Sequence, residues 1–233
     1  MDRLILARKA HRLALRIAIT VAASACATTD VGTPLAPPPP VDQPSLSTGD
    51  RWDFTGRSGA RSEIVYQGRR NDALVFRLSG GPPEGSRRPA TVEELRSDDL
   101  AKITGTAQFT GAAIEYRPDD GALRFPLAVG KSWRHSYVRV IRDAVLPIRP
   151  EEPMIVEVTV KSYERITVPA GSFAAFRIES TTTSADGTAP PFYATYWYAP
   201  AAKTVIKYQA ETTAGRLGLR IEGDALAEYE FKR

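Results

Sequence analysis

Apolar and polar residues alternate with a period of two along most of the chain after Gly49. Three runs show the alternation most clearly: Val156, Val158 and Val160; Leu217, Leu219 and Ile221; and Leu74, Phe76 and Leu78. Successive side chains of a β-strand point to opposite faces, so this period indicates strands with one buried face. Turn-forming residues separate the runs at 68–72, 119–121, 186–187 and 223–224. About ten strands in short succession predict an antiparallel meander.

One segment of this part of the chain follows a helical pattern instead. Thr91 and Glu94 have the spacing of a capping box, and Val92, Leu95 and Ile103 can share one helix face. A short amphipathic helix in an all-strand chain usually covers an open end or the concave face of the sheet. The predicted fold is therefore all-β and mainly antiparallel, a curved sheet or part-open barrel of about ten strands with one short helix.

The first 25 residues have the order of a secretory signal: a basic stretch, an apolar stretch and a cleavage site of small residues. The apolar stretch is about half of the roughly 20 residues that span a bilayer, which argues against a permanent transmembrane anchor. The predicted cleavage site consists of Ala23, Ser24 and Ala25, and Cys26 follows it. An ordinary signal peptidase would release a soluble periplasmic protein from this site.

The same small residues followed by Cys26 resemble the lipobox of bacterial lipoproteins. This resemblance implies that Cys26 becomes a lipidated N-terminus, which is the alternative that we favour. Ala27 follows the cysteine, where aspartate retains lipoproteins in the inner membrane of many diderm bacteria. The resemblance therefore implies an anchor on the periplasmic face of the outer membrane.

Residues 26–48 are rich in proline and poor in charge, so they cannot bury enough apolar surface to fold alone. Their prolines favour extended polyproline II, and we expect a linker that reaches some tens of ångströms. Residues 49–233 are predicted to form a single periplasmic β-domain. Cys26 is the only cysteine of the chain, so no internal disulfide can form and the core must hold the domain together.

The net charge of +4 belongs to the leader and not to the predicted domain. Five of the 31 basic residues and one of the 27 acidic residues precede Cys26, so the remaining chain is balanced. A protein that binds phosphate backbones needs a surplus of Lys and Arg. We therefore expect no nucleic-acid partner.

Several short motifs in the second half of the chain share an order and spacing with one family. They are Phe125-Pro126-Leu127, Val129-Gly130-Lys131-Ser132-Trp133, Val168-Pro169-Ala170-Gly171-Ser172-Phe173, Tyr196-Trp197-Tyr198-Ala199-Pro200 and Val205-Ile206-Lys207-Tyr208. Residues 125–208 thereby resemble uncharacterised bacterial envelope proteins, many of them lipoproteins. That family usually has glycines after the Ala-Pro, where this chain has Ala201, Ala202 and Lys203. The resemblance implies a β-domain and an envelope location, and it supplies no catalytic residue.

The sequence offers little for catalysis. Phe125 stands where a phosphate loop ending at Gly130 would need its first glycine, and no Gly-x-Ser-x-Gly elbow occurs. His135 is the one histidine after the leader, and a lone strand histidine indicates a structural role. The carboxylate pairs 98–99, 119–120 and 151–152 fall in predicted turns, loops or the helix. We expect no catalytic residue, no cofactor and no metal site.

Two apolar features are candidates for ligand or partner contacts. Residues 192–198 are nearly all aromatic, so the predicted strand carries rings on both faces; the candidates there are Tyr193, Tyr196, Trp197 and Tyr198. The second feature is a proline-bounded apolar loop with Val145, Leu146 and Ile148, which either contacts a partner or folds back onto the domain.

Three functions remain open from the sequence. The first is a lipid-anchored, non-catalytic envelope module that binds an envelope protein, peptidoglycan or lipid, or has a structural role. The second is a carrier of an acyl chain or another apolar ligand in a half-barrel cavity. A glycan or peptide hydrolase is the least supported. A cavity in the domain would favour the carrier, and a filled core would favour the first function.

Overall fold

The computed structural model describes residues 32–56, 59–80, 91–106, 112–142, 151–212, 219–223 and 225–232. Several sequence-predicted residues lie outside these ranges: Ala23, Ser24, Ala25, Cys26, Val145, Leu146 and Ile148. Within the ranges, no helix is long and apolar enough to cross a membrane.

The described residues form fourteen strands and one 3-10 turn. The elements are β1 (Thr33–Pro34), β2 (Arg51–Thr55), β3 (Arg61–Arg70), β4 (Ala73–Gly80), β5 (Thr91–Arg96), β6 (Thr104–Thr106), β7 (Ala113–Arg117), β8 (Ser132–Arg142), β9 (Glu152–Val168), β10 (Gly171–Ser184), β11 (Phe192–Ala199), η1 (Pro200–Ala202), β12 (Thr204–Thr212), β13 (Leu219–Glu222) and β14 (Ala225–Glu230).

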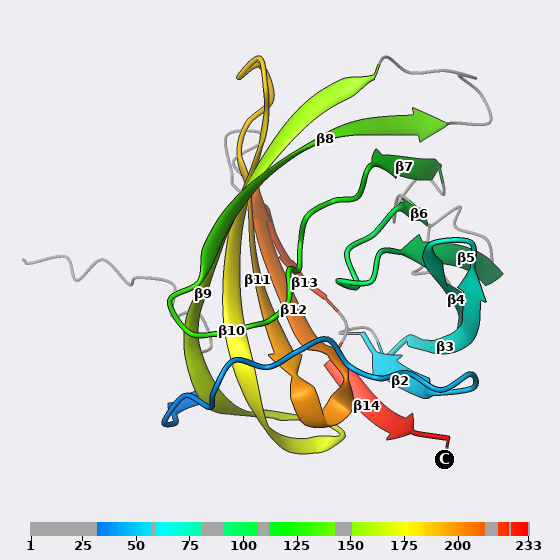
Figure 1. Cartoon of the computed structure of the whole chain (residues 1–233), viewed down its shortest axis with the longest axis vertical. Helices are drawn as coiled ribbons and strands as arrows, with labels where there is room; N and C mark the ends of the chain where they lie inside the picture. The colour runs from blue at the N-terminus through cyan, green and yellow to red at the C-terminus, as the bar shows by residue number, and fades with distance from the viewer. Residues whose placement is uncertain are drawn as a thin grey trace, which may run out of the picture. The chain divides into compact units, whose positions relative to one another are not determined.

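These strands make two antiparallel sheets, and neither sheet is closed. The larger has the order β13-β12-β11-β10-β9-β8-β7-β6, with β1 paired to β9, and the smaller has the order β14-β2-β3-β4-β5. In Figure 1 the long strands of the larger sheet curve beside the smaller one. The all-β, mainly antiparallel prediction is confirmed, although the structure has more strands than the expected ten or so.

The predicted strand at 156–160 lies in the middle of β9, where Val156, Val158 and Val160 are all buried. β9 turns into β10 at Gly171, whose φ of +126° is a conformation that glycine adopts readily. Phe173 then returns to the core. The Val-Pro-Ala-Gly-Ser-Phe motif therefore forms the expected bend between two strands.

The predicted helix over 91–103 is wrong, because its first half is the strand β5. Glu94 of this strand lies opposite Phe76 of β4 and is buried. Its carboxylate meets Arg96 and Lys102, so a buried charged residue occupies a position where an ordinary strand pattern has an apolar one. Because a charged residue stands at this inward position, the sequence of β5 does not show the alternation of apolar and polar residues that indicates a strand.

Hydrogen bonds join the smaller sheet to the η1 turn of the larger sheet. The indole N–H of Trp52 donates to the backbone oxygen of Ala202 at 2.7 Å. Next to this bond, Lys203 adopts a left-handed backbone with φ of 55°. Its ammonium lies 3.1 Å from the buried carboxylate of Asp50. That ion pair offsets the strain of a left-handed residue that is not glycine.

Residues 32–48, which we call the N-terminal strap, lie against the domain. The amide of Leu35 donates to the backbone oxygen of Tyr163 at 2.9 Å, and Val41 and Leu127 exchange two backbone hydrogen bonds. Figure 1 shows the strap crossing the lower part of the larger sheet before it reaches β2. Most of the expected linker is thus attached, while the proposed domain boundary at residue 49 stays a prediction.

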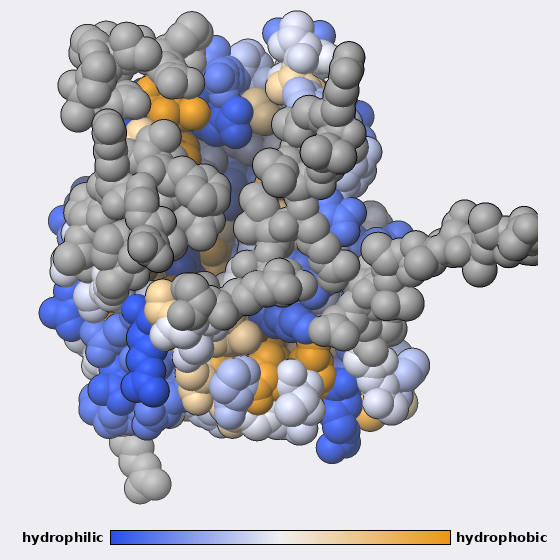
Figure 2. All heavy atoms as spheres, turned by 180° about the vertical axis from the view of Figure 1, so that it is seen from behind, coloured by the Kyte–Doolittle hydropathy of each residue, from blue (hydrophilic) through white to orange (hydrophobic). Residues whose placement is uncertain are grey.

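The core lies between the two sheets and is rich in aromatic rings. Its largest fully buried side chains include Trp52, Phe76, Phe176, Trp197 and Tyr198. From behind, much of the visible described surface is hydrophilic, and apolar side chains gather in a few patches (Figure 2). The packed core does not extend through the whole space between the sheets.

Candidate functional site

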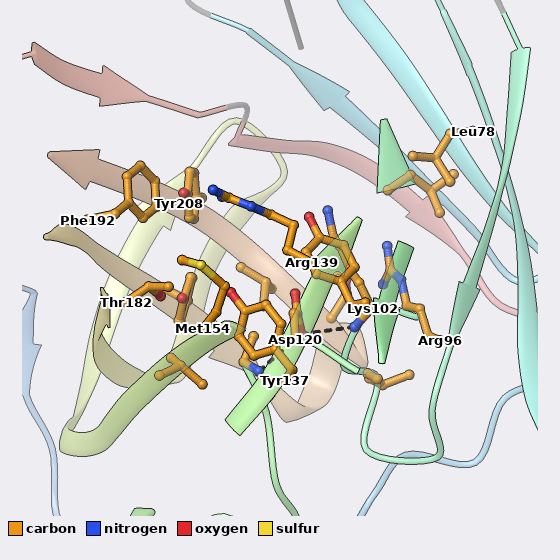
Figure 3. A pocket seen from close by; sticks show the side chains of 18 of the residues that line it. Leu78, Arg96, Lys102, Asp120, Tyr137, Arg139, Met154, Thr182, Phe192 and Tyr208 are labelled. Carbon is orange, nitrogen blue, oxygen red and sulfur yellow. Dashed lines mark hydrogen bonds between the residues drawn. The ribbon is translucent and has the colours of Figure 1, made fainter. Parts of the chain in front are cut away.

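A cavity of about 630 Å³ lies between the two sheets. Its walls come from β2, β3, β4 and β5 of the smaller sheet and from β7 to β12 of the larger one. Figure 3 shows side chains from these strands converging on it. Pockets that hold one small ligand usually measure about 300–1,000 Å³.

The same strand alternation that builds the core also lines the cavity. On β9, Met154 and Val156 face the cavity, and Val158 and Val160 of the same face pack in the core. On β8, Tyr137, which pairs with Met154, and Arg139, which pairs with Glu152, also line the cavity. The cavity begins where bulky apolar residues on the inner faces give way to tyrosines and charged residues.

Four tyrosines form a large part of the wall. Tyr116 and Tyr137 meet edge to face with ring centroids 5.8 Å apart, and Tyr196 and Tyr208 stack at 5.6 Å. Burial raises the pKa of each of them, that of Tyr208 to about 12. The hydroxyls are therefore neutral at physiological pH, and that of Tyr196 shares a hydrogen bond of 2.5 Å with Ser180.

A carboxylate shared by two cations stands in one wall. Arg96 and Lys102 line the cavity, and their charged groups lie 2.6 Å and 3.4 Å from the Glu94 carboxylate. Burial alone would raise the pKa of Glu94, but the charges of Lys102 and Arg96 hold it below its usual range. Glu94 is therefore ionised at neutral pH, and the two cations exceed it by one charge.

Asp120 is the acidic residue among those that line the cavity. Its Oδ1 accepts hydrogen bonds from the amides of Lys102 and Ala122 at 3.0 Å and 3.1 Å. Burial raises its pKa, against the lowering effect of the Lys102 charge. Arg139, on another side, donates through Nε and Nη2 to one oxygen of Glu152 at 2.8 Å and 2.6 Å.

His135 lies on β8 next to this site but does not line it. Its Nε2 lies 3.0 Å from the backbone oxygen of Asp119, whose carboxylate accepts from Arg124 at 2.7 Å. A side chain at Gly121 would come within 2.5 Å of the histidine ring, so this glycine allows the loop to cover it. In the part of the chain that is described, no hydroxyl or thiol bonds to His135, and these residues hold a loop in place without forming a triad.

The aromatic strand 192–198 is divided between core, cavity and surface. Tyr196 lines the cavity, and Tyr193 is 43% exposed outside it. Trp197 and Tyr198 are buried: the Trp197 indole N–H donates to Glu164, and Tyr198 packs against Phe125. Of the sequence candidates that the structure describes, Tyr196 alone faces the cavity.

Sequence reasoning missed Lys102, Arg139, Tyr116, Tyr137 and Tyr208 as members of the site. The sequence signal for these residues lies on one face of β8. His135, Tyr137 and Arg139 occupy successive positions of its inner face, where a fully packed core would have apolar residues. Across the described ranges, no group of three His, Cys, Asp or Glu side chains is placed to hold a metal ion.

The sequence matches no protein-family model, and no curated protein matches it. Two solved structures are similar in fold, and each comparison covers 82% of this chain and 99% of the other. One is a candidate lipoprotein of Parabacteroides distasonis, with 14% identity and a TM-score of 0.46. The other is a candidate exported protein of Bacteroides fragilis with a YmcC-like fold, with 12% identity and a TM-score of 0.37. Similarity at this level carries no functional argument.

Proposed function

We propose that the protein is a lipid-anchored, non-catalytic carrier or receptor of the cell envelope that binds one small amphiphilic molecule between its sheets. The single observation that supports binding is the cavity of about 630 Å³. Its wall mixes apolar side chains such as Met154, Val156 and Phe192 with tyrosine hydroxyls and charged groups. Such a lining suits a ligand with an apolar part and a polar part.

The proposal favours binding over hydrolysis because the described residues supply no activated nucleophile. Asp120 and the tyrosines converge on the cavity, but no serine, threonine or cysteine there is paired with a histidine. It also favours a carrier over a purely structural module, since a structural module gains nothing from an unfilled space in its core.

The binding part is tested with an uncharged fluorescent probe, N-phenyl-1-naphthylamine, and the purified mature protein. We expect saturable fluorescence enhancement that a single-chain detergent displaces. Ala122→Trp places a bulky ring in the cavity wall and should abolish the enhancement, while Ala128→Trp, outside the cavity, should retain it. Both variants must first show the cooperative thermal unfolding of the parent. If the probe does not bind the parent protein, the cavity is not a binding site.

The envelope location rests on the predicted signal of residues 1–25 and on Cys26. A fatty acyl group on this cysteine would hold the domain on the periplasmic face, and the outer membrane is the membrane we propose. Cys26→Ser should stop palmitate labelling and move the protein out of the membrane fraction, and Thr28→Ser should do neither. Membrane association that survives Cys26→Ser would contradict the anchor and leave the binding proposal intact.

A further inference from the structure

Three basic side chains from separate elements line the cavity: Arg96 at the end of β5, Lys102 before β6 and Arg139 on β8. Among the residues that the structure describes, Asp120 is the only acidic one that lines it with them. In Figure 3, Arg96 and Lys102 lie on the right together with Leu78, Asp120 lies near the centre, and Met154 and Phe192 lie on the left. Basic and apolar side chains therefore both line the cavity, with Arg96 and Lys102 apart from Met154 and Phe192.

The carboxylate of Glu94 does not neutralise the basic end. It is 3% exposed and serves both Arg96 and Lys102, so one positive charge remains after this group is counted. The Arg96 side chain is only 13% exposed and also covers the Phe76 ring at 4.4 Å. Lys102 is 46% exposed, and its contact with Glu94 is the longer of the two. Lys102 is thus the cation that a ligand can reach.

Arg139 supplies a second reachable cation. Its Nε and Nη2 both donate to the same oxygen of Glu152, and within the described residues its Nη1 has no hydrogen-bond partner. A guanidinium with unused N–H groups is suited to carboxylate and phosphate oxygens. The position of Arg139 in the cavity wall directs this capacity to a bound molecule.

Asp120 repels a bound anion less strongly than an isolated carboxylate would. Its Oδ1 is occupied by the amides of Lys102 and Ala122, which carry part of its negative charge. Burial raises the pKa of this carboxyl, which further weakens the repulsion. Lys102, whose contact with Glu94 is the longer one, and Arg139, whose Nη1 is unused within the described residues, are therefore the two cations that retain capacity for a negative group.

We propose that the ligand is a single-chain amphiphile with an anionic head group, a carboxylate or a phosphate, whose head contacts Lys102 and Arg139 and whose chain lies along Met154, Val156 and Phe192. This inference rests on the proposed binding function and adds the charge and orientation of the ligand. Complementary charge provides selectivity, and burial of the chain provides affinity.

The test compares matched twelve-carbon amphiphiles as displacers of the uncharged probe, each below its micellar concentration at pH 7.5. They are dodecanoate, dodecyl phosphate, dodecanol and dodecyltrimethylammonium, with acetate and inorganic phosphate as chainless anions. We expect at least one anionic amphiphile to displace the probe at a concentration about tenfold lower than the alcohol or the cation. The two anionic arms separate a carboxylate head from a phosphate head.

Variants locate the head group. Lys102→Met and Arg139→Met should each reduce the anionic preference several-fold, measured within each variant as the ratio of the dodecanol concentration to the anionic amphiphile concentration needed for displacement. Arg134→Met is the matched control, because this β8 arginine is 62% exposed and pairs with Glu157 away from the cavity. Lys102→Gln and Arg139→Gln replace any methionine variant that fails to fold.

Each outcome of the comparison decides the inference. Equal displacement by all four amphiphiles, or a preference for the cation, would overturn it and leave the proposed function standing. Displacement by acetate or phosphate alone would show that the cavity recognises a free anion, which also overturns it. Absence of probe binding to the parent protein would instead remove the proposed function itself.

Discussion

The carboxylate of Glu164 accepts a hydrogen bond of 2.6 Å from the indole N–H of Trp197, and both side chains are fully buried. The same oxygen accepts from the amide of Gly32 at 3.0 Å, and the hydroxyl of Ser162 donates to the other oxygen at 2.9 Å. Within the described ranges, the hydrogen-bond donors to Glu164 are thus one indole, one backbone amide and one hydroxyl. Three hydrogen bonds therefore satisfy the two oxygens of this buried side chain, and one of them comes from the N-terminal strap.

Replacing Glu164 tests how much this network stabilises the fold. Glu164→Ala leaves the Trp197 and Gly32 donors without a buried acceptor, so we expect the free energy of unfolding to fall by about 3 kcal/mol. Glu164→Gln retains an acceptor oxygen for both donors and should cost less than half as much. Urea denaturation of the purified protein measures both values. Equal effects of the two substitutions would show that packing, and not the hydrogen bonds, sets the cost.

Gly32→Ala should detach the N-terminal strap from β9. A Cβ at this position would lie 2.4 Å from the backbone oxygen of Arg165, so the chain must move away. We expect faster hydrogen exchange at the Leu35 amide, which bonds to Tyr163, and earlier proteolysis within the strap. Gly59→Ala is the control: it has a positive φ but no atom within 4 Å, and it should leave the strap protected.

Glu94 should contribute stability at neutral pH that is lost in acid. Its pKa is held below the usual value, so the native state keeps it ionised and the stabilisation disappears as the pH falls through that lowered native pKa. Glu94→Gln should cost about 2 kcal/mol at pH 7, less than a fully buried ion pair because Lys102 is partly exposed. The difference between variant and parent should shrink toward pH 3 in urea titrations. The neighbouring Glu93→Gln, which breaks only an exposed pair with Arg70, should have little effect at any pH.

Asp120 should show the opposite dependence. Its pKa is raised by burial, so ionisation is harder in the native state than in the unfolded chain, and the parent loses stability from this group as the pH rises above about 3.9. Asp120→Asn keeps the acceptor for the two backbone amides and removes the charge. The variant should therefore gain stability relative to the parent between pH 3.5 and pH 7. A constant difference over this range would contradict the prediction, and Asp98→Asn on the exposed surface serves as the control.

The strand content could be predicted because the core-facing residues of the long strands obey a simple alternation. On β9 the residues Val156, Val158 and Val160 are buried as their period requires. The bend at Gly171 could also be predicted, since a proline and a glycine interrupt the ladder together. The alternation does not show how the strands divide into two sheets. That division depends on pairing between distant segments, since β14 pairs with β2 from the opposite end of the chain.

The cavity could not be predicted for a related reason. Glu94 has a core position, yet its sequence context indicates a solvent-exposed helix residue until Arg96 and Lys102 are placed beside it. The run of aromatic residues at 192–198 correctly predicted rings on both faces of the strand. It did not show that Trp197 bonds to Glu164 in the core while Tyr196 lines the cavity. Which ring packs and which remains accessible depends on neighbours that are distant in sequence.

The attachment of Gly32 to Glu164 limits how far the domain can move from its proposed lipid anchor. Only five residues lie between Cys26 and Gly32, and the six Cα–Cα steps that join them span at most about 21 Å even when fully extended. An unattached linker of residues 26–48 would instead reach about 70 Å. Met154 of the cavity lies ten residues from Glu164 on β9, about 33 Å along the strand. A lipidated chain would thus be held near the bilayer at one end of β9, and its ligand would enter at a site remote from the point of attachment.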